Sequence, residues 1–429
     1  MGVFMNTNEI KQSILAGDYN NFFAKIYSDV SLAQNRYAKA CDEFVKLYGL
    51  REDMRLFSAP GRTEVGGNHT DHQHGRVLVG GVDLDVIAIV SPNSENVVRI
   101  KSEGYDMDTV DLNELEIDPA ETGRAISLIR GICASFKANG HEIGGFDAYT
   151  TSNVLKGSGI SSSAAFEVLI SNILSGIYNG GNVDKIEIAK ISQRAESVYF
   201  GKPCGLLDQS ASSLGGFTAI DFKDPANPIV EQVDFDLSKL GYALCVVNTG
   251  GNHANLTQDY ADITVECRLI SNHFNKGFLR DVNPDDFFAE LGKLRVEYND
   301  RAVLRALHFF NEDKRADLEK QALLNNDFDE FLRLVNESGN SSFKYLQNVY
   351  SNSNIYEQGI SLGLAVTEQF MQGIKGAARV HGGGFAGTIQ CFMPTEHLND
   401  YKQYIEKVFG EGSCYILNIR PIGGCEITK

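Results

Sequence analysis

Hydrophobic positions recur along the chain at two different spacings, and each spacing predicts a type of element. In the first fifty residues they recur every three to four positions, as at Ile10, Ile14 and Phe23, which predicts an N-terminal helical cap. Beyond residue 57 the pattern changes to β-branched runs at 77–79 and 82–90, which predict strands. We therefore expect helices first and a sheet after them.

The rest of the chain alternates between the same two patterns. Helical spacing returns at 122–138 and 184–200, and a buried-strand run at 242–247 opens a second half. The second half continues with a long helical stretch from about 259 to 346, followed by strand-like runs at 377–380, 388–392 and 415–419. The pattern changes near 225–240, which predicts two domains, at residues 1–228 and 229–429.

The charge balance narrows the classes of binding partner. Among 429 residues, 56 are acidic and 39 are basic, so the formal net charge is −17. This charge opposes nonspecific binding to nucleic acid or to an anionic membrane. Any anionic cofactor must therefore be neutralised locally, by helix N-termini, basic side chains and a divalent ion.

The cysteines and the apolar runs indicate the compartment. The eight cysteines are scattered without any Cys-x-x-Cys pair, which predicts neither a zinc ribbon nor a disulfide framework. No apolar run approaches the roughly 18 residues of a membrane span, and residues 1–20 lack a signal-peptide pattern. We expect a cytoplasmic protein with reduced thiols and no membrane partner.

A turn of small residues runs into a helix-patterned stretch at 164–170. The turn consists of Gly157, Ser158, Gly159, Ile160, Ser161, Ser162 and Ser163. Glycines let the backbone approach an anion, and the free N–H groups and dipole of the following helix favour negative charge there. The turn therefore fits a phosphate site, with hydroxyls as further donors and a possible metal ligand. A plain Gly/Ser helix cap is the alternative reading of such a turn in isolation.

A second polar segment spans 59–75, where one guanidinium, two carboxylates, three imidazoles and two amides follow a proline turn. Each buried polar group needs a partner, so this segment does not suit a strand in an apolar core. A solvated loop and a metal site built from His69, Asp71, His72 and His74 are both open readings. The metal reading lacks the i, i+4 pairing of helical His sites.

Two further segments carry candidate chemistry. Residues 202–216 contain Asp208 before a run of small polar residues, and Glu196 precedes them on a helical segment. Taken alone, Asp208 suits a helix cap and Glu196 a solvent-facing position. Residues 379–388 contain Gly-x-Gly-x-x-Gly, but a strand-like run follows where a dinucleotide-binding motif requires a helix. A glycine turn packed against backbone or phosphate fits this segment better.

Together, and in this order, the four segments resemble the galactokinase branch of the GHMP kinases, a superfamily of small-molecule kinases. The resemblance runs from about residue 57 to residue 392. It matches 59–71 to the sugar signature, 157–164 to the phosphate loop, 204–209 to the catalytic-Asp segment and 379–387 to the C-terminal glycine motif. It implies a two-domain α+β architecture with the active site in the cleft between the domains.

The resemblance also implies an activity, namely transfer of a phosphoryl group from ATP to the anomeric hydroxyl of galactose. Asp208 would orient or deprotonate that hydroxyl, and Arg62 would stabilise the transferring phosphoryl group, because phosphoryl transfer needs positioning and charge neutralisation. Residues 157–163 would bind the ATP phosphates. Ser163 and Glu196 would hold Mg²⁺, which prefers oxygen ligands.

The resemblance places the sugar against Asn68, His69, Asp71 and Tyr260. Galactokinases usually carry Glu at the position of Asn68, facing the C6 hydroxyl, and Tyr at the position of His72. A neutral amide removes a repulsive charge and would tolerate the C6 carboxylate of galacturonate. Residues 71–73 and 208–211 are also similar to plant galacturonate kinases, so galactose is the first expected substrate and galacturonate the alternative.

Two other classes of function stay open beside the kinase. A sugar-sensing regulator that binds ATP and galactose is one, since some galactokinase relatives act in this way, but the intact phosphate loop with Asp208 and Arg62 favours an enzyme. A metal hydrolase built on the histidine cluster is the other, and it leaves the phosphate loop unexplained. The sequence says nothing of the oligomeric state.

Overall fold

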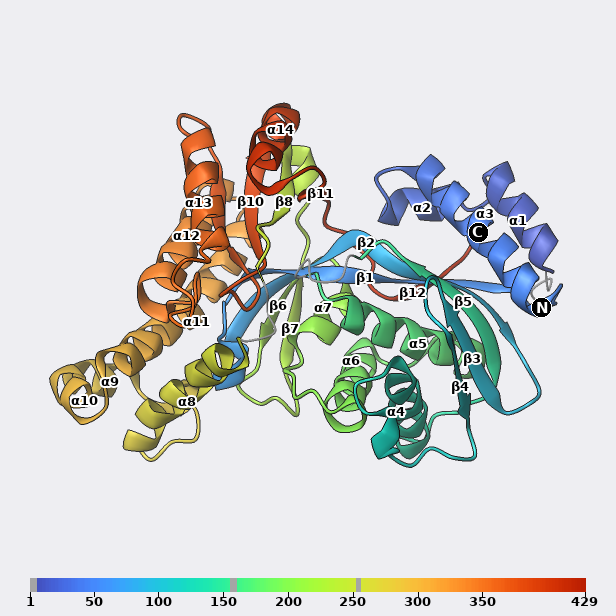
Figure 1. Cartoon of the computed structure of the whole chain (residues 1–429), viewed down its shortest axis with the longest axis horizontal. Helices are drawn as coiled ribbons and strands as arrows, with labels where there is room; N and C mark the ends of the chain where they lie inside the picture. Colours follow the sequence, from blue (N-terminus) through green and yellow to red (C-terminus); the bar gives the residue numbers. More distant parts are fainter. Residues whose placement is uncertain (1–5, 155–159, 252–255) are drawn as a thin grey trace.

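Two β-sheets form the framework of the molecule, and helices cover both faces of the larger sheet (Figure 1). The computed structural model describes residues 6–154, 160–251 and 256–429. Helices from the first fifty residues lie on one side of the larger sheet, and helices between residues 125 and 214 lie on the other side. The mixture of antiparallel sheets and packed helices is the α+β class that the sequence predicts.

The larger sheet has eight strands, in the order β12-β1-β2-β5-β3-β4, with β6 beside β2 and β7 beside β6. Its strands are β1 (Arg55–Gly66), β2 (Arg76–Pro92), β3 (Val97–Ser102), β4 (Met107–Asp111), β5 (Phe146–Ser152), β6 (Phe217–Asp221), β7 (Ile229–Val233) and β12 (Cys425–Ile427). All neighbouring strands are antiparallel except β3 and β5. The smaller sheet is antiparallel, in the order β11-β8-β10-β9. It contains β8 (Tyr242–Asn248), β9 (Ala377–His381), β10 (Thr388–Pro394) and β11 (Cys414–Leu417).

The helices follow the sheets in three groups. The N-terminal group, which confirms the predicted helical cap, is α1 (Thr7–Ala16), α2 (Asn20–Ile26) and α3 (Val30–Tyr48). The group on the opposite face is α4 (Ala125–Ala138), α5 (Ser162–Tyr178), α6 (Lys185–Arg194) and α7 (Leu207–Leu214). The third group is α8 (Thr257–His273), α9 (Pro284–Ala289), α10 (Leu291–Glu297), α11 (Asp300–Leu324), α12 (Phe328–Ser341), α13 (Gly359–Phe370) and α14 (Leu398–Phe409). Short helical turns are η1 (Asp71–Gln73), η2 (Pro119–Glu121), η3 (Ala195–Phe200), η4 (Leu237–Leu240), η6 (Leu279–Asp281), η7 (Ser342–Leu346) and η8 (Thr395–His397).

Apolar side chains point alternately to the two faces of the larger sheet along its central strands, which explains why helices cover both faces. Leu56 of β1 pairs with Ile89 of β2, and both side chains pack against the N-terminal helices. Their neighbours Phe57 and Ala88 also pair, and these side chains point into the main core on the other face. Successive side chains of a strand point to opposite faces, so β1 and β2 must be covered twice.

Asp85 joins the helical cap, the sheet and the C-terminal segment. Its carboxylate is completely buried and accepts hydrogen bonds from the Tyr27 hydroxyl at 2.5 Å, the Ser58 hydroxyl at 2.5 Å and Arg420 Nη1 at 3.1 Å. Arg36 of α3 forms an ion pair with the other carboxylate oxygen. A buried carboxylate needs such partners, since an unpaired charge is costly in an apolar interior.

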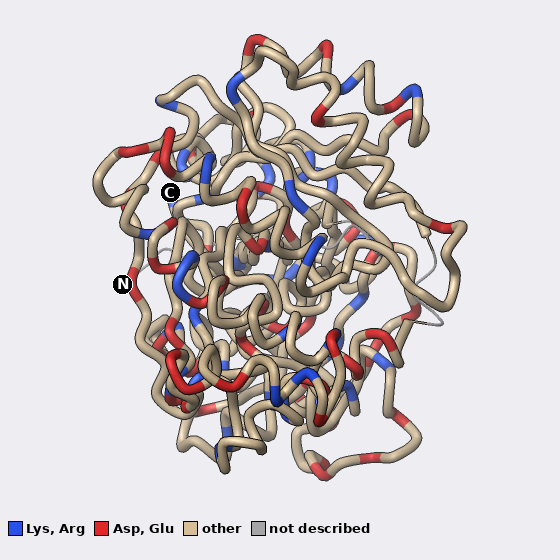
Figure 2. The backbone as a smooth tube through the Cα atoms, turned by 90° about the vertical axis from the view of Figure 1, so that its left-hand side faces the viewer, with Lys and Arg blue, Asp and Glu red and all other residues tan. Residues whose placement is uncertain are grey.

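The predicted domain boundary between residues 228 and 229 runs through the larger sheet. Both β7 and β12 lie after that boundary in sequence, yet β7 pairs with β6 and β12 pairs with β1. Figures 1 and 2 show the two ends of the chain on the same side of the molecule, where Lys429 Nζ lies 3.2 Å from an oxygen of Asp18. The C-terminal segment thus returns to the part of the fold in which the chain began.

Acidic and basic residues alternate along much of the backbone. Figure 2 shows acidic and basic positions interspersed along the backbone rather than gathered into one large basic face. Within the described parts of the chain, no helix is both long and apolar enough to cross a membrane.

Candidate active site

A cavity of about 260 Å³ lies where the four predicted motifs meet. Its walls come from the end of β1, the start of α5, the start of α7 and the loop between β9 and β10. The lining residues are Arg62, Ser161, Ser162, Ser163, Lys202, Asp208, Tyr260, His381, Gly382, Gly383, Gly384, Ala386, Gly387 and Thr388. The structure therefore brings Arg62, Asp208, Tyr260 and the described serines of the small-residue turn to one place, as predicted.

Arg62 and Asp208 form the charged centre of this cavity. Arg62 Nε lies 2.6 Å from Asp208 Oδ1, and the Ser161 hydroxyl donates to the other carboxylate oxygen. Burial raises the pKa of the Asp208 carboxyl, but the charge and hydrogen bond of Arg62 and the hydroxyl of Ser161 outweigh it, so the pKa falls below the ordinary 3.8. Asp208 is therefore a carboxylate at neutral pH, held in place by two donors.

Close backbone packing brings the small-residue turn against β1. The N–H of Arg62 donates to the carbonyl of Ile160 at 3.0 Å. A Cβ atom at Gly61 would lie 2.5 Å from the Ile160 side chain, so only glycine permits this approach. Ser161 has a φ of 57° in the left-handed region, and α5 begins at the next residue. Gly157, Ser158 and Gly159 lie outside the described residues.

Ser163 and Glu196 are neighbours, as a shared metal site requires. The Ser163 hydroxyl lies 3.4 Å from Glu196 Oε1, and Lys202 Nζ lies 2.8 Å from the same oxygen. The other oxygen of Glu196 accepts from Gln209 Nε2 at 2.8 Å. Hydroxyl and carboxylate oxygens suit Mg²⁺, which usually takes its remaining ligands from phosphate and water.

Glu167 is a functional-site neighbour that the sequence analysis did not identify. It is completely buried, one turn along α5 from Ser163, and Gln209 Nε2 donates to its Oε2 at 3.0 Å. Burial and the nearby charge of Glu196 raise the pKa of Glu167 well above 4.5. An acidic residue inside an apolar helix pattern is the signal that could have revealed it.

Asn68 differs from the sequence expectation, because its amide does not line the cavity. The side chain is 0% exposed, and Nδ2 donates to Glu64 Oε1 and to the Gly382 carbonyl, each at 2.8 Å. Its Oδ1 accepts from Asn348 Nδ2 at 2.9 Å and from the Ser342 hydroxyl at 3.2 Å. All four hydrogen-bonding positions of the amide are filled by the protein, so a direct contact with a sugar hydroxyl would have to displace one of them.

The other three predicted sugar-binding residues surround the same region. Tyr260 lines the cavity and donates to the Gly384 carbonyl at 2.9 Å. His69 Nε2 lies 2.8 Å from the Gly383 carbonyl, behind the cavity wall. Asp71 lies in an adjoining cavity of about 360 Å³, next to the backbone of Gly205, where a Cβ would stand 2.5 Å from Asp71 Oδ2.

The histidines of this region do not form a metal centre. Among the described residues, no group of three or more His, Cys, Asp and Glu side chains could hold a metal ion. His74 instead stacks on Phe278, with 3.6 Å between the ring centroids. Burial and the neighbouring His72 lower the pKa of His69 to about 4, so its ring is neutral at neutral pH.

Lys202 and His381 also line the cavity and were not assigned a role from the sequence. Lys202 adds a second cation beside Arg62. His381 lies between the hydroxyls of Thr63 and Thr388, at 3.1 and 3.0 Å from its two ring nitrogens. Burial and the charge of Arg62 lower the pKa of His381 well below 6.5, so it acts as a neutral hydrogen-bonding ring.

A group of buried charged side chains lies between β1, β9 and α11. Glu64 Oε1 lies 2.7 Å from Arg379 Nη2, and Glu312 of α11 pairs with Arg315. Glu319, also of α11, is completely buried, and neither of its oxygens has a hydrogen-bond partner among the described residues. Burial and the charge of Glu312 raise the pKa of Glu319 well above 4.5.

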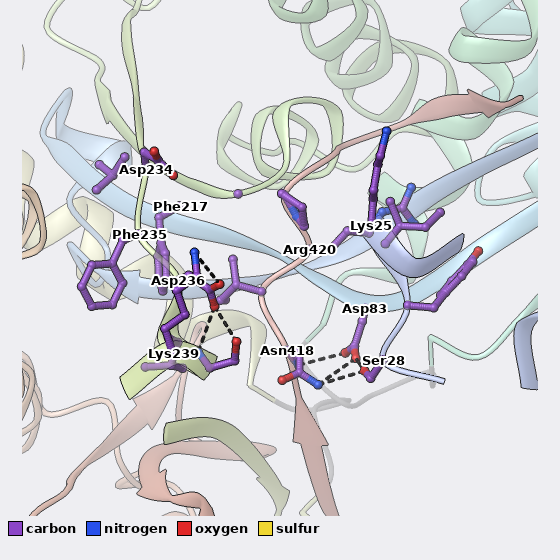
Figure 3. A pocket seen from close by; sticks show the side chains of 18 of the residues that line it. Lys25, Ser28, Asp83, Phe217, Asp234, Phe235, Asp236, Lys239, Asn418 and Arg420 are labelled. Carbon is purple, nitrogen blue, oxygen red and sulfur yellow. Dashed lines mark hydrogen bonds and ion pairs between the residues drawn. The ribbon is translucent and has the colours of Figure 1, made fainter. Parts of the chain in front are cut away.

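A larger cavity, of about 670 Å³, lies elsewhere (Figure 3). It lies between α2, the segment 232–239 and the C-terminal segment 418–421, and none of the predicted site residues lines it. Two of its three acidic side chains are engaged locally, since Asp83 accepts from the Asn418 N–H at 3.0 Å and Asp236 from the Ser238 hydroxyl at 2.6 Å.

Two family models match the chain, and they cover three of the four predicted motifs. The model of the galactokinase galactose-binding signature matches residues 42–92, and the model of the GHMP kinase N-terminal domain matches residues 127–216. The galactokinase of Actinobacillus pleuropneumoniae serotype 5b is 30% identical over 370 residues, which cover 84% of this chain and 91% of the relative. The galactokinase of Streptomyces coelicolor is 29% identical over 368 residues, 86% of this chain and 92% of the relative.

Solved structures show the same architecture. A crystal structure of Lactococcus lactis galactokinase complexed with galactose superposes with a TM-score of 0.74 at 22% identity, covering 89% of this chain and 97% of that one. A mevalonate kinase superposes with a TM-score of 0.60 at 16% identity, covering 85% of this chain and 98% of that one. Sequence similarity over most of its length, together with the matching signature, shows that the chain belongs to the galactokinase family of the GHMP kinases.

Proposed function

We propose that the protein is an ATP-dependent sugar kinase that phosphorylates the anomeric hydroxyl of galactose. The observation that carries the proposal is the Arg62–Asp208 ion pair, held against Ser161 in the cavity where the four motifs meet. A fixed carboxylate can accept a hydrogen bond from a sugar hydroxyl, and an adjacent guanidinium can neutralise a phosphoryl group. Family membership supports ATP as the phosphoryl donor.

The proposed reaction needs little covalent chemistry from the protein. A bond forms between the anomeric oxygen and the γ-phosphorus, the bond to the β,γ-bridging oxygen breaks, and ADP leaves. Asp208 accepts the hydrogen bond of the attacking hydroxyl, whose proton passes to this carboxylate or to solvent as the bond forms. Arg62 and Lys202 offset the negative charge of the phosphates, which the net charge of −17 would otherwise repel.

Mg²⁺ would be held by Ser163 and Glu196, where it would neutralise phosphate charge. We expect Glu196→Gln to raise the Mg²⁺ concentration needed for half-maximal rate more than it raises the KM for sugar, because one anionic oxygen ligand is lost. Rates measured across Mg²⁺ concentrations at saturating sugar test this. A large sugar defect with an unchanged Mg²⁺ titration would contradict the assignment.

Galacturonate is the second candidate substrate, and the structure weakens the argument for it. That argument treats the surroundings of residue 68 as uncharged, but the carboxylate of Glu64 lies 2.8 Å from Asn68 Nδ2. An anionic C6 group there would meet like charge, although Arg379 pairs with Glu64. The Asn68 amide also does not line the cavity, so it gives galacturonate no advantage over galactose.

A panel of sugars tests the proposal directly. ADP release is measured with ATP, Mg²⁺ and, separately, galactose, galacturonate, galactosamine, arabinose and mevalonate, with the Asp208→Asn variant as the inactive control. We expect galactose to give the highest kcat/KM. A higher value for galacturonate would replace galactose as the substrate. Binding of galactose and ATP without turnover would favour the regulator class instead.

A further inference from the structure

Side chains from separate elements hold three successive carbonyls of the glycine loop that lines the cavity. Asn68 Nδ2 donates to the carbonyl of Gly382 at 2.8 Å, and Asn348 Nδ2 donates to that of Gly383 at 3.1 Å. His69 Nε2 lies 2.8 Å from the Gly383 carbonyl as well, and the Tyr260 hydroxyl donates to the Gly384 carbonyl at 2.9 Å. The loop is therefore held by its oxygens, by three side chains outside the cavity lining and by Tyr260 within it.

Peptide geometry then fixes the direction of the loop's N–H groups. In a trans peptide the N–H points opposite to the carbonyl of the same peptide unit. The N–H groups of Gly383 and Gly384 thus point away from Asn68 and Asn348, and no described residue accepts a hydrogen bond from either of them. Both glycines line the cavity, beside Arg62 and Lys202. Two free N–H groups beside two cations make an anion-binding surface.

The two asparagines act as one unit behind this surface. Both are completely buried, and Asn348 Nδ2 donates to Asn68 Oδ1 at 2.9 Å. The Asn348 carbonyl also accepts from the Phe385 N–H at 2.5 Å. A Cβ at Gly384 would stand 2.0 Å from that carbonyl, so the loop has no room to shift toward Asn348. The position of the glycine loop depends on this pair.

We propose that Asn68 and Asn348 are positioning residues that turn the N–H groups of Gly383 and Gly384 toward a phosphate of the bound nucleotide. The inference rests on the proposed kinase function for the identity of the anion. It assigns Asn68 to the nucleotide rather than to the sugar. If Asn68 serves the nucleotide, changing its amide weakens binding of ATP; if it serves the sugar, the change raises the KM for galactose.

The test replaces each amide by a carboxylate of the same shape. Asn68→Asp and Asn348→Asp remove the donors and place a carboxylate against a glycine carbonyl, which releases the loop. The matched control is Asn336→Asp. Asn336 likewise donates to a glycine carbonyl, that of Gly376 at 3.2 Å, but lies outside the cavity lining. Each protein is titrated calorimetrically with a non-hydrolysable ATP analogue and with adenosine, and the KM for galactose is measured.

We expect both loop variants to bind the ATP analogue about tenfold more weakly, while their affinity for adenosine changes less than about twofold, because the lost N–H contacts are to phosphate. Asn336→Asp should match the wild type. An unchanged affinity for the analogue, an equal loss for adenosine, or a rise in the KM for galactose alone would overturn the proposal. If an Asp variant fails to fold, Asn68→Ser and Asn348→Ser, which add no charge, are titrated in its place and judged by the same criteria.

The titrations also separate this inference from the proposed function. They require no turnover, so a wild-type protein that does not phosphorylate galactose would overturn the proposed reaction and leave the binding test valid. Loss of analogue affinity in both variants of such a protein would still support the phosphate role of the loop.

Discussion

At the scale of single residues, Asp208 owes its charge state to two donors. Arg62 and Ser161 keep it ionised despite its burial in the cavity wall. Such a carboxylate is a weak base, so its main contribution is to hold the attacking hydroxyl in line and accept its proton late in the transfer. The same ion pair keeps Arg62 within reach of the transferring group.

We expect Asp208→Asn to lower kcat by about 10²-fold or more, because the variant keeps the size of the side chain and loses only the carboxylate. Binding of a non-hydrolysable ATP analogue should change little. Steady-state kinetics and calorimetry on the same preparation check both expectations. Near-normal turnover would remove Asp208 from the mechanism.

Four ionisable groups in and beside the cavity predict a flat pH profile. Asp208 is already ionised at neutral pH, and burial lowers the pKa of His69 to about 4 and raises that of Tyr260 to about 12. His381 is neutral for the same reason as His69. Since none of these groups changes protonation between pH 7 and pH 9, kcat should vary less than about twofold there.

The profile is measured with saturating Mg²⁺, ATP and sugar. A sigmoidal rise or fall of kcat centred near pH 8 would show that one of these four groups titrates within the range, against the pKa shifts given above. Repeating the measurement with a second buffer ion separates such a titration from a buffer effect.

Which residues lie together in the cavity was predictable from the sequence only where a motif combines reactive side chains with glycine. Arg62, Asp208 and the serines lie in or next to turns rich in small residues, which have few side-chain packing contacts to make in a core. The structure places all of them in the lining of one cavity. Asn68 lies in an equally polar segment, yet its amide is fully hydrogen-bonded to Glu64, to Gly382 and to partners far along the chain. Such contacts depend on the tertiary fold and leave no local signal in the sequence.

At the scale of elements, α11 carries an unusual buried acid. Glu319 packs against β1 at Gly66, where a Cβ would stand 1.6 Å from Glu319 Oε2, so glycine is required opposite this carboxyl. Its pKa lies well above 4.5, so the folded state holds this proton more tightly than the unfolded chain does. Stability is therefore lost as the pH rises above about 4.5, because ionisation is favoured only in the unfolded chain.

We expect Glu319→Gln to raise the Tm at pH 8 by about 2 °C or more and to change it much less at pH 5, because the neutral amide removes the cost of burying a charge. Thermal unfolding at both pH values measures this. Glu330→Gln, at an exposed position of α12, is the control and should show the same small difference at each pH. A Tm that falls equally at both pH values would show that Glu319 is held as a carboxylate.

Element predictions succeeded where the pattern was long and local. The predicted helices at 122–138 and 184–200 correspond to α4, and to α6 continued by η3, and the two predicted strand runs at 77–90 are one strand, β2. The long helical stretch from 259 to 346 is divided among α8 to α12, because Asn283, Asn299 and Asp327 cap new helices within it. Periodicity persists across such breaks, so it does not reveal them.

At the scale of the whole molecule, Asp85 ties the N-terminal helices and the C-terminal segment to the larger sheet. We expect Asp85→Asn to lower the free energy of unfolding by about 3–5 kcal/mol, because Arg420 and Arg36 then become buried cations without a carboxylate. Urea unfolding followed by circular dichroism measures the change.

The control for this variant is Asp42→Asn, which breaks the exposed ion pair with Lys11 and should cost less than about 1 kcal/mol. If Asp85→Asn cost no more than the control, the two arginines would be finding other partners, and Asp85 would not be the link between the chain ends.

The pairing of distant segments was the part of the architecture that the sequence concealed. The change of pattern near 225–240 predicts two regions of the chain, but β7 and β12, which follow the predicted boundary in sequence, belong to the same sheet as β1 to β6. β12 is only three residues long, too short for any periodicity, and its pairing with β1 joins positions more than 360 residues apart. Nothing local to residues 425–427 predicts that partner.

The position of β12 has a consequence for folding during translation. The residues that pair with Leu56, Phe57 and Ser58 are Ile427, Glu426 and Cys425, which are translated long after β1. Until they emerge, the strand that leads into the sugar signature has an open edge, which can pair with other nascent chains. Translation must pass residue 427 before the sheet that positions Arg62 is complete, and a chain that stops before residue 425 has every motif present and this edge unprotected.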